Sequence, residues 1–137
     1  TNKLNLPESI VNSCKEGYEP VRNRFSVTEL LKPTQEILLS RKYWNEIEVD
    51  VSDCINTLFG TAVHKVLEDN TDNPDVETEI KMEIPYKQYV IVGKFDRRNL
   101  KEQLIEDYKT CTVSKITKQK FDDDYKQGMM YAWFTYM

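Results

Sequence analysis

The spacing of apolar residues along the chain predicts one long helix followed by three strands. In residues 52–70, apolar side chains recur every three or four positions, which is typical of a helix with one buried face. These apolar positions are Ile55, Leu58, Phe59, Ala62, Val63, Val66 and Leu67. Apolar and charged residues then alternate over 76–84, which predicts a half-buried strand, and two further strands are expected at 89–96 and 103–109, around a polar turn at 97–101. Three consecutive strands joined by short turns predict an antiparallel meander.

The segments on either side of this region complete the predicted fold. Residues 1–24 are polar and contain two prolines and a glycine, so we expect an irregular N-terminal segment. A capping box that begins at Ser26 predicts a short helix, which Pro33 interrupts before a second helical piece. A loop over 110–120 precedes a final amphipathic helix. The sequence thus predicts a single α+β domain over residues 1–137, with a central, mainly antiparallel sheet of three or slightly more strands flanked by helices.

Composition narrows the class of protein. The chain has 137 residues, of which 39% are hydrophobic and 31% charged, so it fits one domain. No stretch approaches the ~20 apolar residues that span a bilayer. The three cysteines are widely spaced and form neither a CxxC motif nor a disulfide framework, so we expect a reducing, cytoplasmic location. The net charge of −4 means that any binding to an anionic polymer depends on a local patch or on metal ions.

The end of the chain is unusually apolar. Residues 129–134 form an apolar run that stops shortly before residue 137. A domain seldom leaves so much apolar surface uncovered. We therefore expect either that a partner, for instance a second copy of the chain, covers this surface or that the natural protein continues.

Two acids and a lysine are candidates for chemistry. Asp96 ends the second predicted strand and Asp107 lies in the third, so antiparallel pairing can bring them side by side. Two neighbouring carboxylates repel, and a divalent cation such as Mg²⁺ or Mn²⁺ relieves that repulsion. Lys109, two residues beyond Asp107, projects from the same strand face and can orient a metal-activated water. A bare Asp-x-Lys is more often a surface ion pair, so this motif alone does not decide the function.

The predicted long helix carries the only histidine of the chain. His64 aligns with Gly60 and Glu68 at spacings of four residues, on the border of the apolar stripe. A neutral imidazole there can supply a further metal ligand. Gly60 costs about 1 kcal/mol relative to Ala in a helix interior, which is understandable if another chain segment or a substrate approaches closely. Taken alone, a helical histidine is more often a hydrogen-bonded residue, and Glu68 a solvated charge.

Polar groups near the end of the chain suit a nucleic acid. Gln127 and Tyr131 share one face of the last predicted helix, where an amide and a phenol can bond a phosphate or stack on a base. Two groups of basic residues can follow a phosphate backbone, although solvated surface charge is the default interpretation of each. The first group comprises Arg22, Arg24, Lys32, Arg41 and Lys42, and the second comprises Lys109, Lys115, Lys118 and Lys120.

Four motifs follow one another in an order typical of one superfamily. They are Gly60-Thr-Ala-Val-His64-Lys-Val-Leu-Glu68, Gly93-Lys-Phe-Asp96, Ile105-Glu-Asp107-Tyr-Lys109-Thr110 and Gln127-Gly-Met-Met-Tyr131. With these motifs the chain resembles the PD-(D/E)XK nuclease superfamily, and more closely its RecB-like exonuclease branch, which includes many phage nucleases. The segment 26–30 is similar to the N-terminal helix of phage members, so the resemblance covers residues 25–131. Phe95 stands where the name of the superfamily expects proline.

The resemblance implies a restriction-endonuclease-like core and hydrolysis of DNA with Mg²⁺ or Mn²⁺. The residues that match metal ligands are His64, Asp96 and Asp107, and the one that matches the lysine assisting the attacking water is Lys109. Gln127 and Tyr131 match residues that support the active site or contact DNA, and Glu68 matches an acid whose role is less defined. The cysteines that hold an iron–sulfur cluster in some relatives are absent, so none is expected. The usual substrate in the family is DNA, often a single-stranded end.

Several functions are consistent with these motifs. The resemblance favours an exonuclease acting on single-stranded DNA ends in a bacterial host cell, encoded by the host or a phage, in recombination, replication or repair. A structure-specific or sequence-specific endonuclease would use the same site, and closed circular single-stranded DNA distinguishes the two. A non-catalytic nucleic-acid-binding subunit is a third hypothesis, although such a subunit does not need a lysine beside paired acids. The motifs can also coincide by chance in a globular domain.

Overall fold

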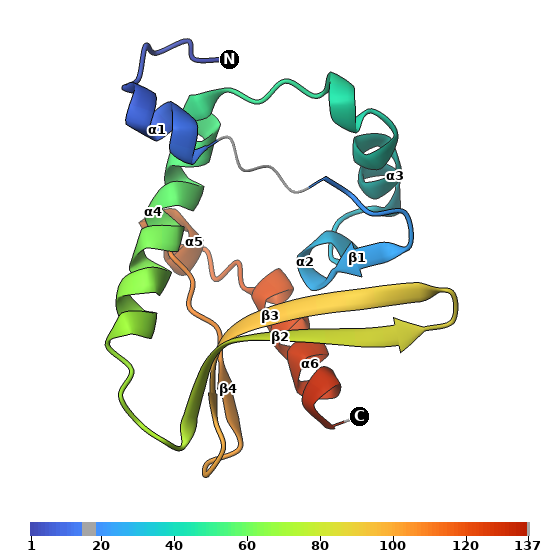
Figure 1. The fold of residues 1–137 in the computed structure, drawn as a ribbon, viewed down its shortest axis with the longest axis vertical. Helices are drawn as coiled ribbons and strands as arrows, with labels where there is room; N and C mark the ends of the chain where they lie inside the picture. Colours follow the sequence, from blue (N-terminus) through green and yellow to red (C-terminus); the bar gives the residue numbers. More distant parts are fainter. Residues whose placement is uncertain (15–18, 137) are drawn as a thin grey trace.

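A long β-hairpin organises the fold. In the computed structural model, which describes residues 1–14 and 19–136, the sheet has four strands with β3 at its centre (Figure 1). The strands are β1 (Arg24–Ser26), β2 (Val76–Tyr86), β3 (Tyr89–Asn99) and β4 (Leu104–Glu106). β2 and β3 form the hairpin, while β1 pairs in parallel with the first part of β3 and β4 pairs antiparallel with its last residues. The sheet is therefore open and mixed.

Six α-helices and a 3-10 turn lie around this sheet within the described residues. They are α1 (Glu8–Ser13), α2 (Val27–Leu30), α3 (Thr34–Lys42), η1 (Trp44–Glu46), α4 (Val51–Asp69), α5 (Val113–Thr117) and α6 (Asp122–Tyr136). Figure 1 shows α6 behind the hairpin and α4 along the side of the molecule, with its C-terminal end near the sheet. The fold is thus α+β, as predicted. Among the described helices, none has the length and apolar character needed to cross a membrane.

The hydrophobic core lies between one face of the sheet and the helices α2 and α6. Its fully buried centre is Phe95 of β3, which packs with Val27 of α2 and with Tyr131 and Phe134 of α6. Gly93 is necessary for this close packing, because a Cβ atom at this position would lie only 2.9 Å from the Phe134 ring. The core therefore fixes β3 against α6 at Phe95, the residue directly before Asp96.

The start of α4 is fixed by hydrogen bonds of Asp50. Its Oδ1 atom accepts from the Ser52 backbone N–H at 3.1 Å, and its Oδ2 atom accepts from the Thr1 hydroxyl at 2.6 Å and from the Lys3 backbone N–H at 3.1 Å. These hydrogen bonds lower the pKa of Asp50 below its usual value. The N-cap of α4 is thus Asp50.

The sheet differs from the predicted, mainly antiparallel meander in two ways. β1 adds a parallel strand, which the sequence did not predict because three residues are too few to show an alternating pattern and their partner is more than sixty positions away. β3 also continues to Asn99, through the predicted polar turn. Its charged residues remain in the sheet because Arg97 pairs with Glu106 and Arg98 with Glu77. The restriction-endonuclease-like core implied by the resemblance stays a prediction.

Other boundaries also differ. The N-terminal segment, expected to be irregular, contains α1, and the expected loop over 110–120 contains α5, which the Thr112 side chain caps. The third strand ends at Glu106, earlier than expected. The capping box is confirmed in part, because the Ser26 hydroxyl accepts from the Glu29 N–H at 3.1 Å, while the Glu29 carboxylate binds Arg41 instead.

Candidate metal centre

His64 and Asp96 form the centre of the candidate site. His64 projects from α4, and its Nδ1 atom lies 3.0 Å from Oδ1 of Asp96. Asp96 follows the buried Phe95 in β3, and because neighbouring strand residues point to opposite faces, its carboxylate points away from the core. Its second oxygen accepts a 2.6 Å hydrogen bond from the Tyr108 backbone N–H. One carboxylate is therefore held both by α4 and by the segment after β4.

Asp107 and Lys109 lie next to this pair. Arg97 pairs with Glu106 in the antiparallel register, and the next position in that register brings Asp107 beside Asp96. Lys109 Nζ lies 2.5 Å from Asp107 Oδ2. Burial raises the pKa of Asp107, Lys109 opposes this rise, and the negative charge of Asp96 adds to it. The structure thus pairs His64 with Asp96 and Lys109 with Asp107, while Asp107 is not in the group of possible ligands that lie within 4.8 Å of one another.

Glu79 is a further acid of this site that the sequence pattern did not identify. It lies on β2 between Thr78 and Ile80, which pair with Arg97 and Phe95, so its position is opposite Asp96. Its backbone has a φ of 53°, in the left-handed region that non-glycine residues seldom adopt. In the sequence, Glu79 looks like any other charge of an alternating strand. Only its cross-strand partner distinguishes it.

The side chains fit a hard divalent cation. One nitrogen of His64 and one carboxylate oxygen each of Glu79 and Asp96 all lie within 4.8 Å of one another. A cation with octahedral bonds of about 2.1 Å holds neighbouring ligand atoms about 3.0 Å apart, which is the spacing between His64 and Asp96. Carboxylate oxygens with one imidazole suit Mg²⁺ or Mn²⁺. These residues, with Asp107 beside Asp96, could therefore hold a metal ion.

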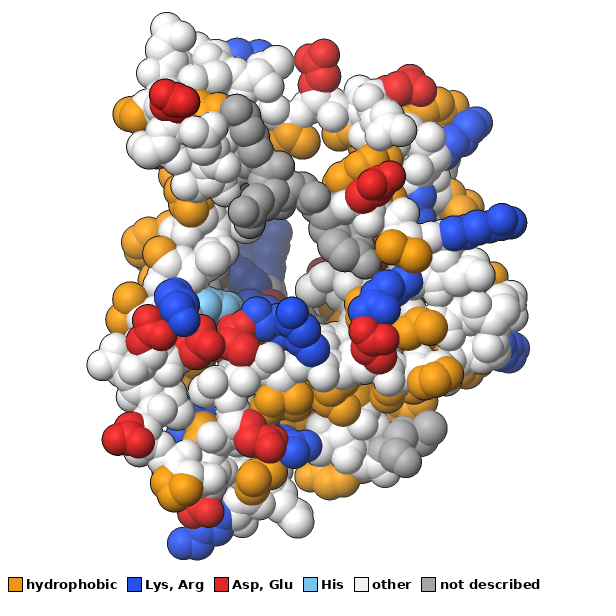
Figure 2. Space-filling model, in the orientation of Figure 1, with side chains coloured by type: hydrophobic (Ala, Val, Ile, Leu, Met, Phe, Trp, Pro, Cys, Tyr) orange, Lys and Arg blue, Asp and Glu red, His pale blue; other side chains and the backbone are white. Residues whose placement is uncertain are grey.

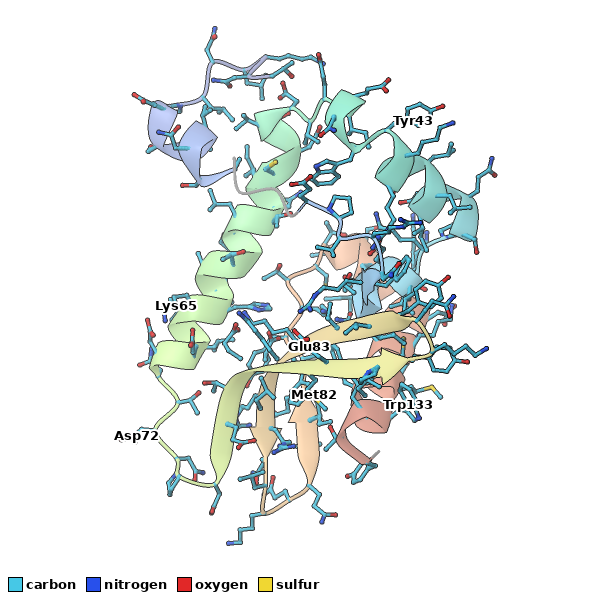
Figure 3. The ribbon with its side chains drawn as sticks, turned by 45° about the vertical axis from the view of Figure 1, so that its right-hand side comes forward. Tyr43, Lys65, Asp72, Met82, Glu83 and Trp133 are labelled. Atoms are coloured by element: carbon cyan, nitrogen blue, oxygen red, sulfur yellow. The ribbon has the colours of Figure 1, made fainter. Side chains whose placement is uncertain are left out.

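A small cleft of about 10 Å³ between α4 and the sheet reaches His64, Glu79 and Asp96, whereas Asp107 and Lys109 are not among the residues that line it. Figure 2 shows the imidazole of His64, the one histidine, on the visible face with acidic and basic side chains around it. Figure 3 shows the molecule turned by 45°, with Lys65 labelled on α4 and Glu83 labelled on β2. The cleft is lined by His64, Leu67, Glu68, Thr71, Thr78, Glu79, Asp96, Arg97 and Tyr108.

Gly60 and Glu68 lie one helical turn on either side of His64. A Cβ atom at Gly60 would lie 3.1 Å from the Thr110 hydroxyl, so the glycine allows close contact with the segment that follows Lys109. This agrees with the close approach that the sequence suggests at Gly60. Glu68 lines the cleft and pairs with Lys65 at 3.1 Å. Its carboxylate is thus near the candidate site without being part of the group of possible metal ligands.

Gln127 and Tyr131 lie under the site and are both buried. The Gln127 amide donates a 2.7 Å hydrogen bond to the Tyr131 hydroxyl. Burial raises the pKa of Tyr131, and the negative charges of Asp107 and Asp96 raise it further. The Gln127 hydrogen bond and the Lys94 backbone oppose this rise in the pKa. Of the two roles that the resemblance implies, these contacts favour support of the site over direct contact with DNA.

The basic residues that the sequence suggests as phosphate contacts have several acidic partners. Arg41 binds Glu29 through two nitrogens, and Lys115 pairs with Asp124 at 2.6 Å. The chain from Lys109 to Thr110 passes close to α4, so the second basic group begins at the candidate site. A phosphate path along this group stays a prediction.

Comparisons of the chain with protein-family models, with curated proteins and with solved structures find no match. The resemblance to RecB-like nucleases thus stays a prediction from the four sequence motifs. Any function is argued from the arrangement of His64, Asp96, Asp107 and Lys109, together with the chemistry of those side chains.

Proposed function

We propose that the protein is a metal-dependent deoxyribonuclease that hydrolyses phosphodiester bonds, with single-stranded DNA ends as its substrate. The proposal is carried by one observation, namely that His64 and Asp96 meet beside Asp107 and its Lys109 partner. An ordinary surface ion pair needs neither an imidazole nor a second carboxylate, whereas a divalent cation binds both. We place the activity in the cytoplasm, in recombination or repair of bacterial or phage DNA.

The proposed roles follow from the chemistry of each group. His64, Asp96 and Asp107 would hold Mg²⁺ or Mn²⁺. Such an ion, when bound, lowers the pKa of a water molecule and stabilises negative charge on a phosphate oxygen. Lys109 can orient the attacking water through Nζ or offset the charge that grows on the phosphate. Water oxygen bonds to phosphorus, the P–O bond on the opposite side breaks, and the leaving oxygen takes up a proton.

The direct test compares linear and closed circular single-stranded DNA, each incubated with the protein in Mg²⁺ and in EDTA. We expect Mg²⁺-dependent release of nucleotides from linear DNA, with no cleavage of the circle. Cleavage of the circle would instead indicate an endonuclease with the same site. DNA binding without any cleavage in millimolar Mg²⁺ or Mn²⁺ would contradict an enzymatic function and favour a non-catalytic accessory subunit.

A further inference from the structure

Glu79 and Lys94 extend the candidate site beyond the residues to which the resemblance assigns a role. We propose that Glu79 is an additional metal ligand and that the Lys94 ammonium group occupies the cation's place beside it until a metal ion binds. This inference rests on the proposed function, because it concerns the same metal. It assigns a ligand on β2 that lies outside the four motifs, and a competing internal cation on β3, Lys94, which lies within the Gly93–Asp96 motif but has no assigned role there.

The position of Glu79 requires a positive partner. It lies opposite Asp96 in the β2–β3 register, and like charges placed directly opposite one another destabilise a sheet. Lys94 Nζ, which pairs with Glu79, supplies a positive charge there, and His64 Nδ1 lies 3.0 Å from Asp96 Oδ1. A divalent ion within reach of both carboxylates would offset the same repulsion more strongly than the single charge of a lysine.

The Glu79 side chain lines the cleft, unlike the two other glutamates of β2. It is 23% exposed, whereas the side chains of Glu77 and Glu83 are 45% and 56% exposed. Its carboxylate also lies within 4.8 Å of the possible ligand atoms of His64 and Asp96. The unusual φ of 53° is compatible with a backbone held in place to aim this side chain. Glu79 is therefore positioned as a ligand rather than as a solvated strand charge.

The Lys94 partner can be displaced. Its side chain is 47% exposed, and ion pairs of exposed lysines contribute little to stability. Lys94 lies two residues before Asp96 and so projects from the same face of β3. When a metal binds Glu79, the ammonium group can turn to solvent at small cost. Removal of the Lys94 ammonium group should accordingly strengthen metal binding.

The test is a calorimetric titration of the protein with MnCl₂ alone. We expect Glu79→Gln to weaken Mn²⁺ binding roughly tenfold or more, and Lys94→Gln to strengthen it about threefold or more. Matched controls are available on the same strands. Glu77→Gln removes a carboxylate of β2 that pairs with Arg98 outside the site, and Lys81→Gln removes the lysine directly opposite Lys94. Both controls should bind Mn²⁺ like the unmodified protein.

Each outcome separates this inference from the proposed function. If Glu79→Gln binds Mn²⁺ like Glu77→Gln while Asp96→Asn loses binding, the metal site stands without Glu79 and the inference is wrong. If Lys94→Gln binds Mn²⁺ no better than Lys81→Gln, Lys94 does not compete with the metal. An unmodified protein that binds no Mn²⁺ at millimolar concentration contradicts the proposed function itself. Should Glu79→Gln fail to fold, Glu79→Asp, which keeps the charge but shortens its reach, is titrated instead with the same expectation.

Discussion

The two faces of β3 differ sharply where Phe95 and Asp96 follow one another. On one face, Phe95 is completely buried against α2 and α6 in a closed apolar cluster. On the other face, the Asp96 carboxylate meets His64 of α4 at 3.0 Å and faces a cleft. Apolar packing stabilises the first face, whereas polar contacts and close backbone approach hold the second. Apolar packing thus fixes the sheet from one side, and the polar groups of the candidate site lie on the other side.

Helix α4, which carries His64, is held in place by few apolar contacts. Val51 is the one buried residue of the helix, and large apolar side chains such as Phe59 and Val66 are exposed. The contacts that join α4 to the site are the His64–Asp96 pair and the approach of Gly60 to Thr110. Changes on the core face should therefore cost stability, whereas changes on the site face should cost activity and metal binding.

The largest effect on stability is expected at the core face. Phe95→Ala should lower the free energy of unfolding by about 3–5 kcal/mol, because it leaves a cavity at the fully buried centre of the core. Urea unfolding followed by circular dichroism measures this loss. The neighbouring change Asp96→Asn is the control and should alter stability by less than about 1 kcal/mol. Equal losses of unfolding free energy in the two variants would contradict the proposed difference between the two faces of β3.

On the site face, Asp107→Ala should abolish metal binding and reduce DNA cleavage by roughly a thousandfold, about 4 kcal/mol in the activation free energy. Its stability should be unchanged or higher, because the burial that raises the pKa of Asp107 makes its charged form costly. Cleavage rates on labelled single-stranded DNA and thermal unfolding are measured on the same preparation. A variant that cleaves normally would refute the assignment of Asp107.

Lys109→Ala should separate turnover from metal binding. We expect cleavage to fall by about a hundredfold or more, since the group that orients water or offsets phosphate charge is lost, while Mn²⁺ affinity stays close to normal. Lys118→Ala removes a lysine of the same basic segment and serves as the control for general loss of charge. If both variants lose activity equally, the effect comes from DNA binding rather than from the site.

Two glycines give a smaller, paired test of the core. Gly93→Ala should destabilise the protein by about 1–3 kcal/mol, because the added methyl group would lie 2.9 Å from Phe134. Gly128→Ala adds the same group on α6 where no atom lies within 4 Å, so it should stabilise the helix by up to about 1 kcal/mol. Thermal unfolding distinguishes the two signs. Two changes of the same sign would contradict the packing described at Gly93.

The smallest predicted effect is the pH dependence of stability at Asp107. Because its pKa is raised in the folded protein, the folded state binds more protons between the unfolded and folded pKa values, and stability falls as pH rises through this window. Asp107→Asn should remove this cost, so the variant gains stability relative to the unmodified protein at pH 7 and loses that advantage near pH 4. Unfolding temperatures across this range measure it. An advantage that grows as pH falls would contradict the raised pKa.

Local patterns were sufficient to predict the long elements. The helical spacing over 52–70 predicts α4, observed as Val51–Asp69, and the alternating residues after it predict β2. Both elements are long enough for their periodicity to outweigh local exceptions. The short strand β1 could not be predicted in this way, because its pairing with β3 is set by tertiary contacts rather than by its three residues.

Those residues of the candidate site that belong to sequence motifs could be predicted. His64, Asp96, Asp107 and Lys109 all have distinctive spacing, and the structure forms two pairs from them, His64 with Asp96 and Lys109 with Asp107. Glu79 was missed because Glu77 and Glu83 give the same alternating pattern on β2. Its position opposite Asp96 and its left-handed backbone depend on the register of the hairpin, which the sequence of one strand does not reveal.

A crystal structure of the protein with Mn²⁺, examined by anomalous scattering, tests the central claim most directly. We predict one strong peak on the cleft face of β3, within about 2.5 Å of a His64 nitrogen and of carboxylate oxygens of Asp96 and Asp107. A peak bound elsewhere, or crystals in millimolar Mn²⁺ with no peak beside His64 and Asp96, would contradict the account.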